Sequence, residues 1–218
     1  MFPFDMGSVK GRFSRTEIQH LALASVLFAG VMAGWVTGGF ADELVYTNFG
    51  LVVFFVLIIA AFLLHEIAHK FKAQSYGCWS EFRIQTSGIY ITLAAMIFGV
   101  LVFAPGATMV VGNPNKKSMG KIALSGPLTN LFMAGFFLLL YPISPKIAWL
   151  GVFFSALIAI FNLLPFFVLD GKKVLQWNPY VWSGVFFLIL SLLIYVTFVL
   201  PWSFKDMLNI PWPFDWPF

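Results

Sequence analysis

Long apolar runs separated by short polar connections dominate the chain. A helix that crosses the hydrocarbon core of a bilayer needs about 20 apolar residues. Runs that approach this length cover residues 18–40, 49–64, 122–141, 147–168 and 181–200. No long polar segment separates them, so we expect an all-α polytopic membrane protein with about five to six transmembrane helices. We expect these helices to form a single membrane-embedded domain over residues 1–218.

Basic residues predict which side of the membrane the helix ends face. Lys10, Arg12 and Arg15 precede the first apolar run, and Lys70 and Lys72 follow the second. Because cytoplasmic loops carry an excess of Lys and Arg, the N-terminus and the end of the second helix are predicted to face the cytoplasm. The first run is long for a cleaved signal peptide, so we interpret it as an anchor. We therefore expect a multi-pass protein of the cell membrane.

A further apolar run, residues 89–104, is short for a span and is followed by Pro105-Gly106, which favours a turn. This run either crosses the membrane or re-enters on the side from which it came. Crossing would place Asp170 on the face opposite His65, and it would put the lysine cluster at residues 116–121 outside the cell. Re-entry keeps all of them on the cytoplasmic side, so we favour re-entry.

The composition narrows the classes of function. Hydrophobic residues make up 60% of the chain and charged residues 10%, and the formal net charge is +4. A positive charge this small and dispersed predicts no nucleic-acid partner, and the lipid bilayer is the expected surrounding. Cys78 is the single cysteine, which excludes a disulfide within the chain and a cysteine-based metal cluster.

The second apolar run ends in the pentapeptide His65-Glu66-Ile67-Ala68-His69. On a helix, residues four apart lie on one face, so both imidazoles can bind one metal ion while Glu66 accepts a proton nearby. This spacing is typical of a zinc site, here inside a membrane. The alternative is a pair of interfacial histidines beside a solvated glutamate.

A second polar group lies at the end of the fourth apolar run, where Asn162 and Asp170 interrupt an otherwise apolar segment. Polar side chains are expensive in a membrane, so these two need an explanation. Pro165 removes a backbone donor and loosens the helix, and Gly171 permits a tight turn. Asp170 can then leave the helical path and act as the third ligand of a catalytic zinc site. The alternative is an ordinary helix end with Asp170 in a loop.

Three segments together resemble the site-2 protease family of intramembrane zinc metalloproteases: the pentapeptide at His65 to His69, the segment from Ser125 to Asn130, and the segment from Asn162 to Gly171. The resemblance covers a catalytic core of about residues 49–177. The chain is similar to the compact members of the family, which lack PDZ and CBS domains. One departure is Lys172, which stands where many members have a second glycine.

The resemblance implies a role for each polar residue of these motifs. His65, His69 and Asp170 would bind one Zn²⁺ ion, Glu66 would be the catalytic base, and Asn162 would face the reacting carbonyl. Zinc held by three protein ligands lowers the pKa of a water to about 7, which suits hydrolysis. The expected activity is hydrolysis of peptide bonds within or near transmembrane segments, and the expected partner is a transmembrane protein substrate.

Between the two motifs, Glu81 to Thr86 alternates polar and apolar side chains, which is typical of a strand. Ala107 to Val111 is a candidate partner, and the two would form a short β-hairpin around the re-entrant run. An edge strand here would hold a substrate in an extended form through main-chain hydrogen bonds. The alternative is a short amphipathic connector.

Two other functions fit the histidine motif. Zinc importers of the ZIP type also place a His-Glu-x-x-His-like motif in a membrane helix, but a transporter needs a chain of polar ligands through the bilayer. Polar residues deep in the apolar runs are few, and we interpret His20 as an interfacial anchor. The other alternative is a proteolytically silent homologue that acts by binding, against which the presence of Glu66 argues.

Overall fold

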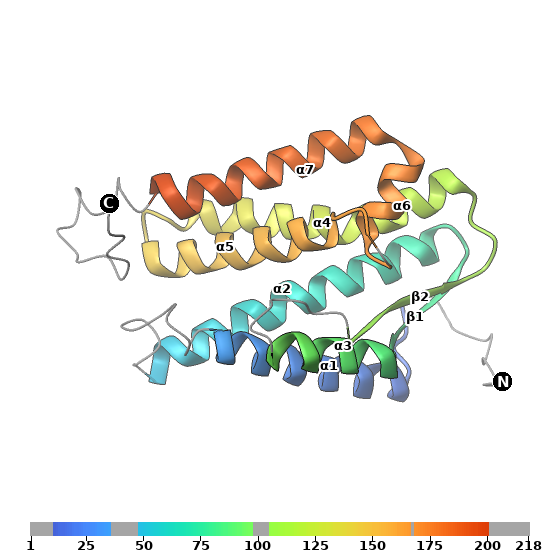
Figure 1. Cartoon of the computed structure of the whole chain (residues 1–218), viewed down its shortest axis with the longest axis horizontal. Helices are drawn as coiled ribbons and strands as arrows, with labels where there is room; N and C mark the ends of the chain where they lie inside the picture. The colour runs from blue at the N-terminus through green and yellow to red at the C-terminus, as the bar shows by residue number, and fades with distance from the viewer. Residues whose placement is uncertain (1–10, 36–47, 98–104, 167, 201–218) are drawn as a thin grey trace.

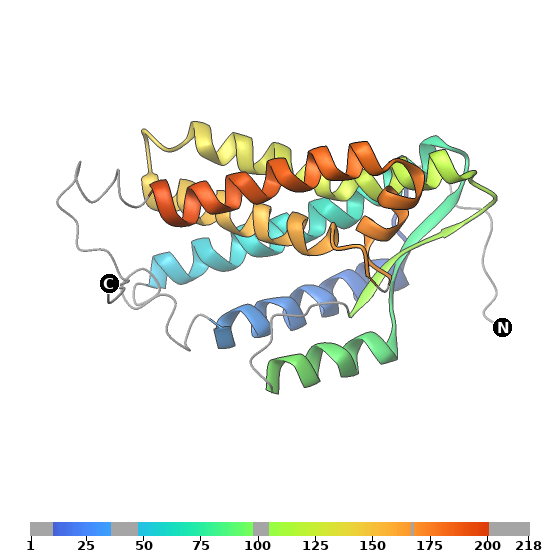
Figure 2. The ribbon, with the colours of Figure 1, turned by 45° about the horizontal axis from the view of Figure 1, so that its top comes forward.

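The structure is a computed structural model that describes residues 11–35, 48–97, 105–166 and 168–200. Its long helices run roughly side by side, with a two-stranded sheet at one end of the bundle (Figure 1). The elements are, in chain order, α1 (Arg15–Trp35), α2 (Asn48–Ser75), β1 (Trp79–Ile84), α3 (Thr86–Ile97), β2 (Gly106–Val111), α4 (Lys116–Leu139), α5 (Pro145–Asn162), α6 (Asp170–Trp177), α7 (Pro179–Ile194) and the π-helical turn η2 (Tyr195–Val199). Helices α1 and α3 lie on one side of α2, and α4, α5 and α7 lie on the other (Figure 2).

Three described helical segments are long and apolar enough to cross a membrane, namely Val52–Ser75, Lys116–Leu139 and Pro179–Val199. A shorter apolar helix covers Ile147–Asn162. The expected class, a mainly helical membrane protein with a small sheet, agrees with these elements, and the expected number of spans stays a prediction. The first apolar run extends beyond Trp35 into a part of the chain that lies outside the described residues.

The fourth helix ends earlier than we expected from its apolar run, which continues to residue 168. Helix α5 stops at Asn162, and the N–H of Leu164 then donates to the carbonyl of Phe161 in a turn (3.2 Å). Pro165 accounts for this end, because the residue before a proline is disfavoured in the helical conformation. The chain turns and begins α6 at Asp170. Gly171 is required in this turn, because a Cβ there would lie 1.9 Å from the carbonyl oxygen of Leu163.

Close packing of aromatic and small side chains holds the helices together. Helix α4 packs against α2, α5 and α6. Phe54 of α2 and Phe154 of α5 are buried with their rings edge to face at 5.2 Å, and Ala134 of α4 is buried in the same cluster. In a membrane, contacts of this kind stabilise the fold through van der Waals packing, since lipid tails are as apolar as the side chains. The result is a rigid support for the polar groups of α2 and α6.

The two strands pair antiparallel, with Phe82 opposite Thr108. The predicted strands are therefore present, although each begins one or two residues earlier than expected. Beyond the strand ends, the N–H of Gln85 donates to the carbonyl of Pro105 (2.8 Å). The segment that contains α3 therefore starts and finishes at the same end of the sheet, and its re-entry into the membrane stays a prediction. Its residues 98–104 lie outside the described part of the chain.

Helix α1 covers the edge of β1 that faces away from β2. The N–H of Phe82 donates to Glu17 (3.1 Å), and the N–H of Ile84 donates to His20 Nδ1 (3.3 Å). We expected β1 to be the open edge strand, and this expectation is corrected here, whereas the interpretation of His20 as an interfacial anchor stays a prediction. The open edge belongs to β2, because α1 occupies the outer edge of β1.

Lys70 does not serve as a free positive charge at the membrane surface, as we expected from its position after the histidine motif. Its side chain is 2% exposed and forms an ion pair with Glu17 of α1. A buried charge is tolerated only when it is paired and hydrogen-bonded. This pair therefore joins α1 to the helix that carries both histidines.

Candidate metal centre

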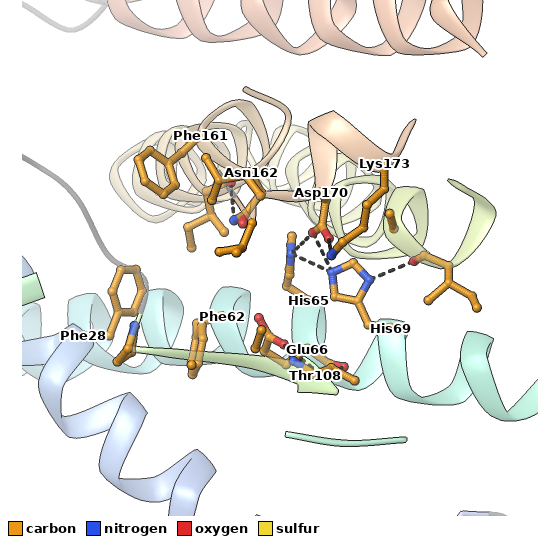
Figure 3. A pocket seen from close by; sticks show the side chains of 18 of the residues that line it. Phe28, Phe62, His65, Glu66, His69, Thr108, Phe161, Asn162, Asp170 and Lys173 are labelled. Carbon is orange, nitrogen blue, oxygen red and sulfur yellow. Dashed lines mark hydrogen bonds and ion pairs between the residues drawn. The ribbon is translucent and has the colours of Figure 1, made fainter. Parts of the chain in front are cut away.

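Three side chains from two helices meet in one buried group. His65 and His69 lie one turn apart on α2, and Asp170 is the first residue of α6 (Figure 3). The Nε2 atoms of the two histidines are 3.0 Å apart. Oδ2 of Asp170 lies 3.3 Å from Nε2 of His65 and 2.8 Å from Nε2 of His69. The structure thus brings together the three residues that the sequence proposes as ligands, and the group could hold a metal ion.

The outer nitrogens of both histidines face hydrogen-bond acceptors. Nδ1 of His69 donates to the carbonyl of Ile122 (2.8 Å), and Nδ1 of His65 donates to Oδ1 of Asn130 (2.5 Å). The NH₂ group of the Asn130 side chain donates in turn to the carbonyl of Ala61 (3.0 Å). Its oxygen, Oδ1, must therefore be the atom that faces His65. A neutral imidazole with its proton on Nδ1 carries a lone pair on Nε2. The Nε2 lone pairs of both histidines therefore point toward the space that Oδ2 of Asp170 also faces.

The donor set fits a zinc ion. Two imidazole nitrogens and one carboxylate oxygen are frequent protein ligands of catalytic zinc, and outer-shell acceptors at Nδ1 usually accompany them. Ligand atoms about 2.0–2.2 Å from a tetrahedral zinc lie roughly 3.3–3.6 Å from one another. The three observed separations of 2.8 to 3.3 Å are close to this range. Three buried electron pairs that face one another would repel unless a cation lay between them.

Helix α4 approaches this group so closely that only glycine fits at one position. A Cβ on Gly126 would lie 2.4 Å from Nε2 of His69 and 2.6 Å from Nε2 of His65. Pro127 follows inside the helix, and Asn130 lies one turn further on. Gly126 therefore lets α4 come close enough for the carbonyl of Ile122 and the amide of Asn130 to reach the two imidazoles.

Lys173 supports Asp170 from within α6. Its ammonium donates to Oδ1 of Asp170 (3.2 Å), the oxygen that does not face the histidines. The positive charge of the Lys173 ammonium favours the ionised form of this buried carboxylate. The carboxylate is therefore negatively charged at neutral pH, as a metal ligand must be.

Glu66 lies beside the three grouped side chains but turns toward the sheet. Oε2 of its half-buried carboxylate accepts the N–H of Thr108 (3.2 Å) and the hydroxyl of Thr108 (2.9 Å). The Thr108 hydroxyl also lies 3.2 Å from the Glu66 carbonyl. Figure 3 shows Glu66 next to Thr108, with Asp170 beyond the two histidines. The carboxylate is thus close to the candidate metal site without being part of the three-residue group.

Asn162 is the last residue of α5, and its amide donates to the carbonyl of Ile158 (3.0 Å). It lines the same pocket as His65, Glu66, His69 and Asp170. The structure therefore places all five sequence-proposed site residues around one cavity. The other walls of this pocket come from β2 and from apolar side chains that include Phe28, Phe62, Phe154 and Phe161.

Sequence reasoning assigned no role to three residues of this site. Asn130 was noted only as part of a family-like segment, although an amide inside an apolar helix carries the same signal that identified Asn162. Lys173 was one of two adjacent lysines. Its spacing of three residues from Asp170 was the only sign that the two side chains could meet on one helix face. Thr108 carried no signal, because its contact with Glu66 joins segments that no local pattern relates.

The apolar helical fold and the buried His-His-Asp group define the class: a membrane protein with a candidate metal site. Over 198 residues the chain is 34% identical to a protein of Methanocaldococcus jannaschii named "Putative zinc metalloprotease", covering 86% of this chain and 97% of that protein. The chain belongs to the same family as this relative, and the name of the relative supports a metalloprotease. No family model and no solved structure matches the chain.

Proposed function

We propose that this protein is a zinc metalloprotease of the site-2 protease type, which hydrolyses peptide bonds within or near the transmembrane segments of membrane proteins. One observation carries the proposal: His65, His69 and Asp170 share a pocket with the Glu66 carboxylate and a strand edge, in a fold with apolar helices long enough to span a membrane. Sequence similarity to a protein named as a zinc metalloprotease also supports proteolytic activity.

When bound by these three ligands, zinc supplies Lewis acidity that lowers the pKa of a water to about 7 and polarises the reacting carbonyl. The chain itself prepares the ligands. The Ile122 carbonyl and the Asn130 amide keep the protons of both histidines on Nδ1, and Lys173 holds Asp170 in its ionised form. These outer contacts also fix the planes of the two imidazole rings.

Glu66 is the proposed proton carrier. Its carboxylate accepts a proton from the attacking water and then gives that proton to the amine of the leaving half. One carboxylate thereby serves first as base and then as acid, and no covalent intermediate with the chain forms. In the structure this carboxylate bonds to Thr108, so rotation of the Glu66 side chain must precede the reaction.

The open edge of β2 is the proposed binding site for the substrate. Cleavage needs an extended peptide, whereas a transmembrane substrate is helical, so the enzyme must hold the unwound segment. Gly106, Thr108 and Val110 of β2 line the pocket that contains the candidate metal site. Main-chain pairing along this edge would hold many different sequences in the same conformation.

We predict that Asn162→Ala keeps its zinc but cleaves substrate about 100-fold more slowly. The proposed role of the amide is to leave the Ile158 carbonyl and donate to the oxyanion as charge develops, and loss of one such donor costs on the order of 10²-fold in rate. Turnover of a model single-span substrate measures this effect. Asn115→Ala removes an exposed amide at the start of α4 and is the matched control, expected to retain wild-type turnover. Unchanged turnover in Asn162→Ala would reduce Asn162 to a helix-packing residue.

We propose that the pocket opens toward the cytoplasm, and cysteine labelling tests this orientation. Lys117→Cys and Lys172→Cys, each at an exposed position, are introduced after the buried Cys78 has been replaced. Both are predicted to react with a membrane-impermeant maleimide only in inverted vesicles, because the run that contains α3 re-enters. Lys146→Cys, at the start of α5, is the control and should react only in intact cells. Labelling of Lys117→Cys in intact cells would contradict the proposed topology.

A direct comparison of cleavage with transport tests the function itself. Purified protein in vesicles is given a single-span substrate in the bilayer and zinc outside, and both product formation and zinc uptake are followed. A protease of this kind forms two fragments without zinc uptake. Zinc uptake without fragments would instead support the transporter class, and the protease proposal would then be abandoned.

A further inference from the structure

The contact between Glu66 and Thr108 places the proposed base at the strand edge where the substrate would bind. Thr108 uses both its backbone N–H and its hydroxyl to hold Oε2 of Glu66, at 3.2 and 2.9 Å. A carboxylate that accepts two hydrogen bonds is firmly held, because bonds to an ionised acceptor are stronger than neutral ones. The position of Glu66 in this structure is therefore fixed by β2.

The register of the sheet shows that this N–H belongs to the open edge. Antiparallel strands alternate between pairs that exchange hydrogen bonds and pairs that do not. Gln85 bonds to Pro105 across the pair, whereas the N–H groups of Phe82 and Ile84 point to α1. By this alternation Thr108, opposite Phe82, directs its N–H and carbonyl away from β1.

Gly106 and Val110 share this orientation with Thr108, since they lie two residues away along β2. All three line the pocket, and Thr108 is the middle one. An extended peptide added to this edge would place one of its carbonyl groups against the Thr108 N–H. The Glu66 carboxylate now occupies the position that this carbonyl would take.

We propose that Thr108 holds Glu66 in a resting position, and that an extended substrate segment releases it by taking over the Thr108 N–H as it pairs with β2. This inference rests on the proposed protease function and adds a regulatory step to it. The base becomes free only when a peptide lies along the edge. Thr108 is a positioning residue in this scheme, since it acts through Glu66 and through the backbone of the substrate.

A fixed support for Glu66 is the competing account, and the two differ in their effect on substrate binding. If Thr108 only oriented the base for reaction, loss of its hydroxyl would lower kcat and leave the affinity for peptide unchanged. If Glu66 competes with the substrate for the Thr108 N–H, loss of the hydroxyl weakens the competitor. The affinity for an extended peptide then rises.

The test measures peptide binding without turnover. The full-length, zinc-loaded protein in nanodiscs is titrated with a fluorescent, extended apolar peptide in which a –CH₂–CH₂– link replaces the central amide, so that it cannot be cleaved. Thr108→Val keeps the β-branched shape and the backbone N–H and removes only the hydroxyl. We expect its Kd to fall about 10- to 100-fold, the range for loss of one competing hydrogen bond to a charged group. Glu66→Ala, which removes the competitor, should bind at least as tightly as Thr108→Val.

Two controls complete the experiment. Thr108→Ser retains the hydroxyl and should keep the wild-type Kd, and Glu81→Gln changes a carboxylate on β1 and should also leave Kd unchanged. A Kd that is unchanged or higher in Thr108→Val or in Glu66→Ala overturns the proposal. Because binding is read without cleavage, this failure is distinct from failure of the protease assignment, which would appear as a wild-type protein that binds peptide and cleaves no substrate.

Discussion

Glu66→Gln is expected to fold, insert and retain zinc, yet to lose at least about 10³-fold in the rate of peptide hydrolysis. The amide has nearly the same shape as the carboxylate, and its oxygen can still accept the hydrogen bonds from Thr108. It cannot accept a proton from the attacking water, and general acid–base groups contribute about 10²- to 10⁴-fold each. Cleavage of a single-span substrate, measured beside zinc content, reports both properties.

Glu81→Gln is the matched control for this prediction. Glu81 is also a buried carboxylate near the sheet, but it contacts Arg83 and Ser14 rather than the candidate metal site. Its amide variant should cleave within a few-fold of the wild-type rate. Wild-type cleavage by Glu66→Gln would remove Glu66 from the mechanism, and loss of zinc from Glu66→Gln would show that it is a ligand.

The second large effect is expected for Asp170→Ala, which should fail to retain zinc. The substitution removes the only carboxylate in the described group of three candidate ligands. Loss of an outer-shell partner typically costs 10- to 100-fold in metal affinity, so loss of a ligand should cost more than about 100-fold. Titration with a chromophoric zinc chelator measures the affinity directly.

Lys173→Met provides a graded comparison for the same measurement. It removes the ammonium that donates to Asp170 and leaves the carboxylate in place, so a loss of about 10- to 100-fold is expected. The order wild type, Lys173→Met, Asp170→Ala should therefore hold for zinc affinity. A full equivalent of tightly bound zinc in Asp170→Ala would exclude Asp170 as a ligand.

Local patterns were sufficient for much of the fold. The helical repeat placed His65 and His69 on one face of α2, and alternation of polar and apolar side chains found β1. Pro165 marked a weak point in the fourth apolar run, although α5 ends before the proline rather than beyond it. These features depend on residues close in sequence, for which spacing alone carries the signal.

Contacts between distant segments account for what the sequence did not reveal. Lys70 follows a membrane helix as a surface lysine would, and only the three-dimensional structure brings Glu17 to it and buries both. The covering of β1 by α1 reversed the assignment of the open edge, because it depends on the N–H of Phe82 meeting a side chain from another helix. The pairing of Asp170 with the two histidines was expected from its polar position after Pro165, from membrane sidedness and from family resemblance, since no spacing relates residues so far apart.

Mass spectrometry of the cleavage products tests the central claim most directly. Purified protein and a single-span substrate are reconstituted together, with and without a zinc chelator, and the masses of both fragments are measured. The account predicts two fragments whose masses sum to that of the substrate plus one water, with the broken bond inside or beside the apolar segment. It also predicts that chelation stops cleavage and that added zinc restores it. Cleavage that persists in the metal-free protein, or a broken bond confined to a distant soluble part of the substrate, would contradict the account.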